Sequence, residues 1–152
     1  MTICLSASNF GRKSLGPEIL RLDHIAIAVK DLAGAIDLFQ NLMGLQVSQI
    51  EDVPEQKAKV GFIPLGETKL ELVQPTTQDT GLAKFLDRTG GGLHHICLEV
   101  QNIVAALKWY KDNGIELIDT EPRTGAHNKK IAFLHPKSTK GVLIELCQCA
   151  SK

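Results

Sequence analysis

The sequence predicts an α+β fold built from two βαβββ modules, and an internal repeat is the main observation behind this prediction. Residues 22–29 (LDHIAIAV) resemble residues 93–100 (LHHICLEV), and a polar pair and a helical segment follow each stretch. Later segments repeat in the same order: 45–47 with 115–117, 59–64 with 130–136, and 69–74 with 143–148. Each half therefore contains a strand, a helix and three further strands, which favours duplication of one unit.

The helix in each half is marked at both ends. Asp31 and Asn102 are good N-cap residues because their side chains accept hydrogen bonds from the first free amides of a helix. Gly44 and Gly114 suit the left-handed conformation that commonly ends one. The predicted helices span residues 31–43 and 102–113.

Length and composition favour one globular domain. The chain has 152 residues, of which 43% are hydrophobic and 22% charged, as in ordinary globular proteins. We expect an N-terminal tail at residues 1–20 and a single domain at residues 21–148. Within this domain, a short helix and a glycine-rich turn connect the halves, so the modules span about 21–76 and 92–148 with a linker at 77–91.

Charge and cysteine content exclude several classes of protein. Seventeen basic and seventeen acidic residues cancel, which argues against a nucleic-acid partner, and no apolar run is long enough for a membrane span. Four irregularly spaced cysteines do not form a disulfide framework and indicate a reducing compartment. We expect a cytoplasmic protein, or a mitochondrial one if the tail, which contains Arg12 and Lys13, is a presequence.

Four ligand-type side chains fall on equivalent strand faces. Strand alternation places His24 and His95 opposite the aliphatic faces that pack on the helices, and it places Glu71 and Glu145 likewise. A carboxylate among aliphatic neighbours is costly unless it is paired or binds a metal. Mixed nitrogen and oxygen ligands suit a divalent ion such as Co, Ni, Mn or Zn. The same alternation directs His94 away from this face, so it is not counted as a ligand.

Four segments carry a family resemblance: residues 22–26 (LDHIA), 92–100 (GLHHICLEV), 119–125 (DTEPRTG) and 135–145 (HPKSTKGVLIE). Through them the chain resembles the vicinal oxygen chelate superfamily, which includes glyoxalases, bleomycin resistance proteins and dioxygenases. Within it, the chain is most similar to the methylmalonyl-CoA epimerase family. The resemblance covers about residues 21–148 and implies a mixed-sheet, half-barrel glyoxalase-like fold and a homodimer.

The resemblance also implies roles for individual residues. His24, His95 and Glu145 match the metal ligands of the family, and the fourth ligand position, glutamine in some members, is Glu71 here. Glu145 is the expected first acid/base, because a ligand carboxylate can shift and accept a proton. Some members place a glutamate base at the position of Val60, which leaves the second acid/base open. Lys59 beside it is a weak candidate, since alternation directs it outward.

The implied reaction is metal-dependent epimerisation at C2 of methylmalonyl-CoA, (2R) to (2S), through a metal-stabilised enolate. The partner is then an acyl-CoA thioester, whose phosphates need a local basic patch in a chain without net charge. Residues 121–140 are basic, and Arg123, Lys137 and Lys140 are the candidates for binding CoA or substrate.

Three alternatives remain open. A His-Glu-His-Glu ligand set also resembles glyoxalase I (lactoylglutathione lyase), although the strand after His24 lacks the arginine that such enzymes use for glutathione. A ring-cleaving dioxygenase uses two histidines and one carboxylate, so Glu71 argues against it. A non-catalytic small-molecule binding protein would have an apolar or aromatic concave face, whereas aromatic residues make up only 5% of this chain.

Overall fold

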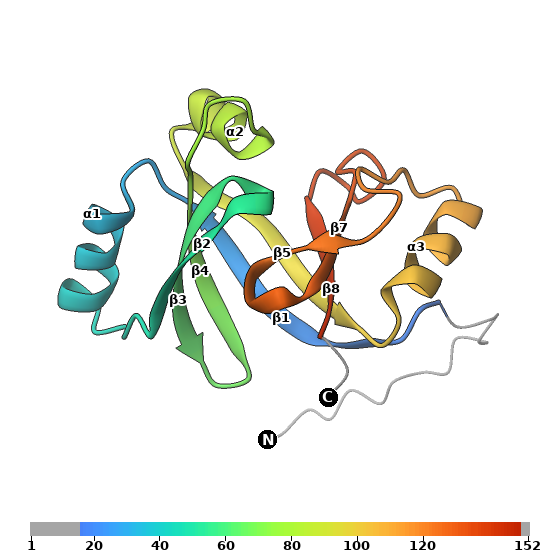
Figure 1. Ribbon diagram of the computed structural model, residues 1–152, viewed down its shortest axis with the longest axis horizontal. Coiled ribbons are helices and arrows are strands. Elements are labelled where there is room, and N and C mark those ends of the chain that lie inside the picture. The colour runs from blue at the N-terminus through green and yellow to red at the C-terminus, as the bar shows by residue number, and fades with distance from the viewer. Residues whose placement is uncertain (1–15, 150–152) are drawn as a thin grey trace, which may run out of the picture.

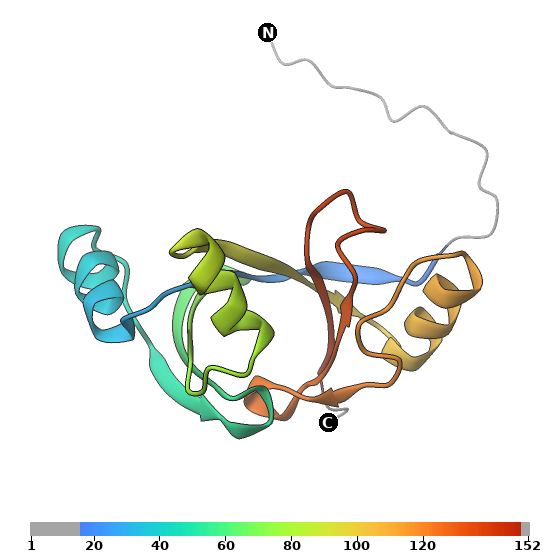
Figure 2. The same cartoon turned by 90° about the horizontal axis from the view of Figure 1, so that it is seen from above.

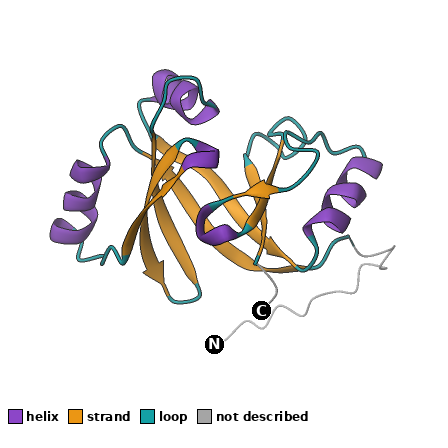
Figure 3. Ribbon diagram, viewed as in Figure 1, coloured by secondary structure: helices purple, strands orange, loops and turns teal. Residues whose placement is uncertain are grey.

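The computed structural model describes residues 16–149, so Cys4 and most of the expected N-terminal tail lie outside the described residues. The strands are β1 (Ile19–Ala28), β2 (Gln49–Val53), β3 (Ala58–Leu65), β4 (Thr68–Pro75), β5 (Gly92–Val100), β6 (Arg123–Thr124), β7 (Lys130–Leu134) and β8 (Ile144–Gln148). The helices are α1 (Leu32–Ile36), α2 (Gly81–Thr89) and α3 (Ile103–Asp112), with shorter helical segments η1 (Asp37–Leu42), η2 (Pro54–Gln56) and η3 (Ala126–Asn128) (Figures 1 and 3). None of the helices from residue 16 to residue 149 is long and apolar enough to cross a membrane.

All eight strands form one mixed sheet in the order β2-β3-β4-β1-β5-β8-β7-β6. The first strand of each module runs parallel to the last strand of that module, β1 beside β4 and β5 beside β8. The modules meet where β1 and β5 pair in antiparallel orientation. Seen from above, the sheet is strongly curled (Figure 2), so the predicted α+β half-barrel of two βαβββ modules is confirmed.

The expected caps lie at the ends of the helices. The side chain of Asp31 accepts a hydrogen bond from the Ala33 amide, and that of Asn102 accepts one from the Ala105 amide. Gly44 and Gly114 adopt positive φ angles of 73° and 80° directly after the helical segments. The first helix differs from the prediction, because α1 continues as the π-helical segment η1 instead of a regular α-helix.

Two short segments predicted as strands, residues 45–47 and 115–117, are not strands. Leu45 and Val47 instead pack against the core beneath α1, and regular pairing begins only at β2. In the second module, Leu117 forms a single isolated bridge to Leu134 before the chain reaches β6. The apolar pattern in both places reflects burial of side chains, and not pairing of the backbone.

The aliphatic strand faces pack on the helices as expected. Ile27 of β1 and Val29, which directly follows this strand, contact the cluster that contains Leu32 of α1. In the second module, Val100 and Leu146 pack against α3. The opposite, inner face of the sheet carries the histidines and the glutamates, and α2 covers one end of this face through Leu86.

Candidate metal centre

Two irregularities in the β1–β5 pairing shape the centre of the inner face. Leu22 lies opposite Leu98 and His24 opposite Cys97, so Asp23 is an extra residue on β1. At the other end, Ala26 lies opposite His95 and Ile27 opposite Leu93, so His94 is an extra residue on β5. The two extra residues occupy equivalent positions in the repeat, each directly before a buried histidine.

The irregularity on β5 corrects the prediction that His94 points away from the site. Its Nδ1 lies 2.8 Å from His95 Nδ1, and its ring packs edge-on against Phe85 of α2. Burial, followed by the neighbouring His95, lowers the pKa of His94 to about 4, so its imidazole is neutral near pH 7. His94 therefore contacts the site as a support for His95, and it lies outside the group of possible metal ligands.

His24, His95 and Glu145 bring ligand atoms to within 4.8 Å of one another. The Nε2 atoms of the two histidines are 3.2 Å apart, and Glu145 Oε2 lies 3.0 Å from His95 Nε2. All three residues are at most 8% exposed. The structure thus assembles, from β1, β5 and β8, three of the four side chains that the sequence singles out as metal ligands.

The hydrogen bonds around the two histidines fit a bound cation. Asp23 Oδ2 lies 2.9 Å from His24 Nδ1, and a carboxylate can only accept, so His24 Nδ1 carries a proton. When His95 Nδ1 donates to neutral His94, both Nε2 atoms present lone pairs to the space between the rings. Two lone pairs 3.2 Å apart repel unless a positive charge lies between them. The donor set of two imidazole nitrogens and one carboxylate suits a divalent transition metal.

The two glutamates differ in position and in the direction in which their pKa values are shifted. Glu71 lies on the other side of the His24 ring, with its Oε1 3.2 Å from Nδ1, and is not part of the three-residue cluster. Burial raises the pKa of Glu71. Burial alone would also raise the pKa of Glu145, but the hydrogen bond from His95 outweighs it, so that pKa lies below its ordinary value. Glu145 is therefore an ionised carboxylate near neutral pH.

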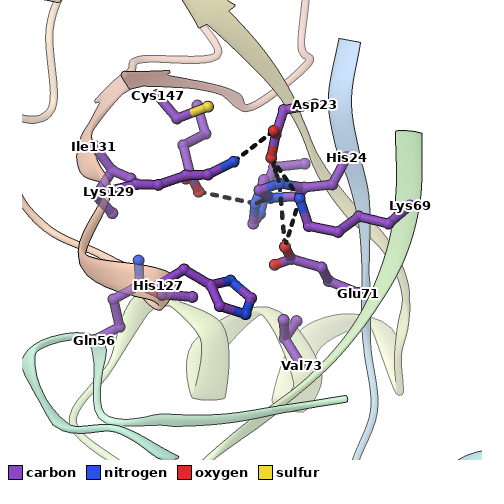
Figure 4. A pocket seen from close by; sticks show the side chains of 13 residues that line it. Asp23, His24, Gln56, Lys69, Glu71, Val73, His127, Lys129, Ile131 and Cys147 are labelled. Atoms are coloured by element: carbon purple, nitrogen blue, oxygen red, sulfur yellow. Dashed lines mark hydrogen bonds and ion pairs between the residues drawn. The ribbon is translucent and has the colours of Figure 1, made fainter. Parts of the chain in front are cut away.

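Asp23 connects the centre to several basic side chains (Figure 4). Its buried carboxylate accepts hydrogen bonds from Lys69 Nζ at 2.7 Å, Lys129 Nζ at 2.6 Å and Arg21 Nη2 at 3.3 Å. Burial opposes the charge on Asp23, but the bonds from His24, Lys129 and Lys69 prevail and hold its pKa well below the usual range. One carboxylate thus orients a candidate ligand and anchors a lysine from each module.

A small cavity lies beside this cluster. Gln56 of η2, His127 of η3 and Lys129 contribute to its lining, together with the histidines and glutamates. In Figure 4, His127 points its ring into the cavity toward Glu71 and Val73. The lining comes from both modules, because η2 belongs to the first module and η3 to the second.

Several candidates from the sequence lie away from this cavity. The side chain of Lys59 is 44% exposed and its Nζ pairs with Asp52 at 3.7 Å, so the structure does not bring it to the site. Arg123 pairs with Asp119 at 3.2 Å and stacks over Phe133. Lys137 and Lys140 are exposed on the loop between β7 and β8.

Four lining residues have no clear signal in the sequence. Asp23 precedes a ligand histidine, and strict alternation directs it to the opposite face, so only the bulge reveals its role. Lys129 is one of several lysines in a basic window, and nothing local distinguishes it. Gln56 and His127 lie in turns, where side-chain periodicity carries no information.

A second possible ligand group, formed by Asp23, His24 and Cys97, is less suited to a metal. The basic side chains already neutralise Asp23. Burial raises the pKa of Cys97 well above its ordinary value, and the hydrogen bond with Cys147 adds to this, so the sulfur remains a thiol. Within residues 16–149, Cys97, Cys147 and Cys149 are free cysteines.

Comparison with known proteins places the chain in a family. Residues 23–133 match the model of the glyoxalase/bleomycin resistance protein/dioxygenase superfamily. The mitochondrial methylmalonyl-CoA epimerase of Homo sapiens is 46% identical over 129 residues, which are 84% of this chain and 73% of the human protein. The ethylmalonyl-CoA/methylmalonyl-CoA epimerase of Cereibacter sphaeroides is 43% identical over 84% of this chain and 97% of its own length. The chain belongs to the methylmalonyl-CoA epimerase family.

Solved structures of this epimerase family have the same fold. A methylmalonyl-CoA epimerase in complex with methylmalonyl-CoA and NH₄⁺, and a variant of the Streptomyces coelicolor enzyme in complex with 2-nitronate-propionyl-CoA, each give a TM-score of 0.83 at 32% identity. Each match covers 88% of this chain and 97% of the other. A lactoylglutathione lyase of Escherichia coli O157:H7 is more distant, at 30% identity over 83% of this chain and 93% of the lyase.

Proposed function

We propose that this protein interconverts the (2R) and (2S) epimers of methylmalonyl-CoA with a divalent cation bound by His24, His95 and Glu145. The observation that carries the proposal is the buried cluster of these three side chains beside an accessible cavity, in a chain of the epimerase family. The cavity adjoins ligand-type side chains that are almost fully buried.

The reaction needs a base near C2 of the substrate. The C2 proton lies between a thioester and a carboxylate, so its removal gives an enolate. His24, His95 and Glu145 would hold the cation, which when bound would supply Lewis-acid stabilisation of the negative charge on the thioester oxygen. Glu145 is ionised and lies at the wall of the cavity, so its carboxylate can accept the C2 proton on one face and return it.

Asp23 and His94 hold the two histidines in place for this role. Each supports the Nδ1 atom of the histidine that follows it in the chain. Such supports typically change metal affinity or activity by about 10–100-fold when they are removed. Glu71 is the proposed fourth ligand, and Co, Ni, Mn or Zn suits the combined set of nitrogen and oxygen donors.

The negative charges of the substrate call for basic side chains. Lys69 and Lys129 carry ammonium groups at the Asp23 side of the cavity, where they can attract the malonyl carboxylate. Arg123, Lys137 and Lys140 lie farther out, and we retain them as candidates for the phosphates of CoA.

The second candidate function is that of a lactoylglutathione lyase, because the ligand types and a relative at 30% identity fit it as well. To distinguish the two, Co²⁺-loaded protein would be given (2R)-methylmalonyl-CoA or the hemithioacetal of methylglyoxal and glutathione at equal concentration. We expect NMR to show conversion of the thioester to the other epimer. Turnover of the hemithioacetal alone would favour the lyase.

We also propose a homodimer and a cytoplasmic location. The exposed apolar side chains of Leu38 and Leu42 in η1, and of Met43 directly after it, offer a surface that a second copy could cover. The free cysteines suit a reducing compartment, and relatives include both bacterial proteins and proteins named as mitochondrial. Sedimentation analysis would test the dimer, and imaging of the tagged full chain would test the location against the mitochondrial alternative.

A further inference from the structure

His127 belongs to the second module, but its ring lies in the cavity and contacts the first module. It lies in η3, between β6 and β7 of the second module, and its ring packs on Phe62 of β3 in the first module with 4.5 Å between ring centroids. Its φ of 54° is in the left-handed region, which a histidine adopts only at some cost. The fold therefore holds this ring in the cavity in spite of an unfavourable backbone conformation.

Glu51 of β2 holds His127 at two points. The His127 amide donates a hydrogen bond to Glu51 Oε1 at 3.2 Å, and Glu51 Oε2 lies 3.5 Å from His127 Nε2. This Oε2 atom is buried without a hydrogen-bond partner among residues 16–149. A buried carboxylate oxygen in this position stabilises a protonated imidazole, so the pair resembles a histidine and its orienting acid.

The Glu51–His127 pair lies beside Val60, where the first module has an aliphatic side chain in place of an acid. Val60 of β3 is fully buried, and it pairs with Glu51 of β2 on one side and Val73 of β4 on the other. An aliphatic side chain at that point can neither accept nor donate a proton. His127 contacts two of these three strands, β2 through Glu51 and β3 through Phe62.

Other polar groups of the cavity wall are less suited to proton transfer at C2. Asp23 holds Lys129 in an ion pair that, against the effect of burial, raises the pKa of this lysine, so it remains an ammonium ion. Lys69 also contacts Asp23, and Gln56 does not titrate. His127 is an imidazole of the cavity lining, and among the described residues only Phe62 and Glu51 contact its ring.

The geometry points to His127 as the second acid/base of the epimerisation, oriented by Glu51 and acting on the face of the substrate opposite Glu145. This inference rests on the proposed function and names a residue for one of its steps. In one direction, the C2–H bond breaks and Glu145 takes the proton while the electron pair forms the enolate. Protonated His127 then donates a proton to C2 on the other face and becomes neutral. The reverse direction uses the same groups in opposite roles, and exchange with water restores both.

The test compares the two epimers in heavy water. Metal-loaded wild-type protein, H127N and E51Q would each receive pure (2R)- or (2S)-methylmalonyl-CoA, and NMR would follow C2 deuteration separately from conversion. We expect H127N to lower conversion by about 100-fold or more, the range typical of general acid/base groups. Deuterium exchange of one epimer should persist within about threefold of wild type, because Glu145 still serves its face. E51Q should reduce conversion less, with the same asymmetry.

Two further variants distinguish the loss of an acid/base group from a change in the structure of the protein. H135N is the matched control, because His135 is a partly exposed histidine near Glu116 and does not line the cavity. H127G relieves the positive φ, and added imidazole should restore part of its conversion. Conversion by H127N within threefold of wild type, or equal loss of exchange for both epimers, would overturn the inference. Absence of conversion by wild type would instead overturn the proposed function.

Discussion

Replacing Asp23 by asparagine tests whether this buried carboxylate stabilises the fold and orients His24 in the metal centre. Asp23 is 2% exposed, and its carboxylate contacts Lys69 and Lys129, whose side chains are only 19% and 17% exposed. D23N preserves the shape of the side chain but removes its charge. Two ammonium groups then remain close together without their shared counterion, and His24 loses the negatively charged acceptor that fixes its ring.

The magnitude follows from these contacts. Removing one partner from a buried ion pair costs about 3–5 kcal/mol, a large part of the roughly 5–15 kcal/mol that stabilises a typical domain. We therefore expect D23N to lower the free energy of unfolding by about 3–5 kcal/mol and the melting temperature by on the order of 10 °C. The loss of support at His24 should also weaken metal binding by about 10–100-fold.

The dependence on pH has a definite sign. The pKa of Asp23 in the folded protein lies below its ordinary value, so its contribution to stability is complete above the pKa of the unfolded state, near 4. The contribution is lost as the pH falls below that value toward the folded pKa. Wild type should therefore lose more stability between about pH 5 and pH 2 than D23N does.

Urea unfolding at pH 7 and pH 3, with metal titration by calorimetry, would measure both effects. D112N is the control, since Asp112 forms an exposed pair with Lys108 within α3, and such pairs contribute about 0.3–0.5 kcal/mol. If D23N lowers the free energy of unfolding at pH 7 by less than about 1 kcal/mol, the reasoning is refuted, because breaking a buried ion pair should cost about 3–5 kcal/mol.

Three other perturbations probe different parts of the site. Removing the metal with a chelator should abolish conversion, and restoring it to about 100 times its dissociation constant should stabilise the fold by about 2.7 kcal/mol in a melting experiment. E145Q cannot accept a proton and should lower conversion by about 10²–10⁴-fold at saturating metal; activity near wild type would remove Glu145 from the reaction. G125A should destabilise the protein by about 1–3 kcal/mol because the new Cβ would lie 2.7 Å from Ile131 and 3.2 Å from Gln56. G81A, whose Cβ meets nothing within 4 Å, is its control, and equal urea midpoints for the two variants would contradict this account.

The features that the sequence predicts well are those with a local period or a repeat. The duplicated order of strands and helices is clear because each module repeats the same apolar pattern and the same caps. His24, His95 and Glu145 can be found in the same way, since alternation and duplication place them on one face. These rules depend only on neighbouring residues in the chain, so no knowledge of the final packing is needed.

The features that the sequence does not predict depend on register and on contacts between the modules. A single extra residue in the pairing brings Asp23 and His94 to the histidines, against the expected alternation. His127 and Lys129 reach the cavity from a turn that crosses to the other module. Lys59, in contrast, is adjacent to a key position in the sequence but lies on the exposed side of its strand. Residues 45–47 show the same limitation, because burial and strand pairing leave similar apolar patterns.

Proton exchange at C2 of methylmalonyl-CoA is the measurement that tests the central claim most directly. Metal-loaded and chelator-treated protein would each be incubated with either epimer in heavy water, beside a buffer blank that corrects for spontaneous exchange. We expect the metal-loaded protein to deuterate C2 and to bring both epimers to the same mixture, and we expect the chelator-treated protein to match the blank. Exchange no faster than the blank, in protein that demonstrably binds the metal, would contradict the assignment of this site to epimerisation.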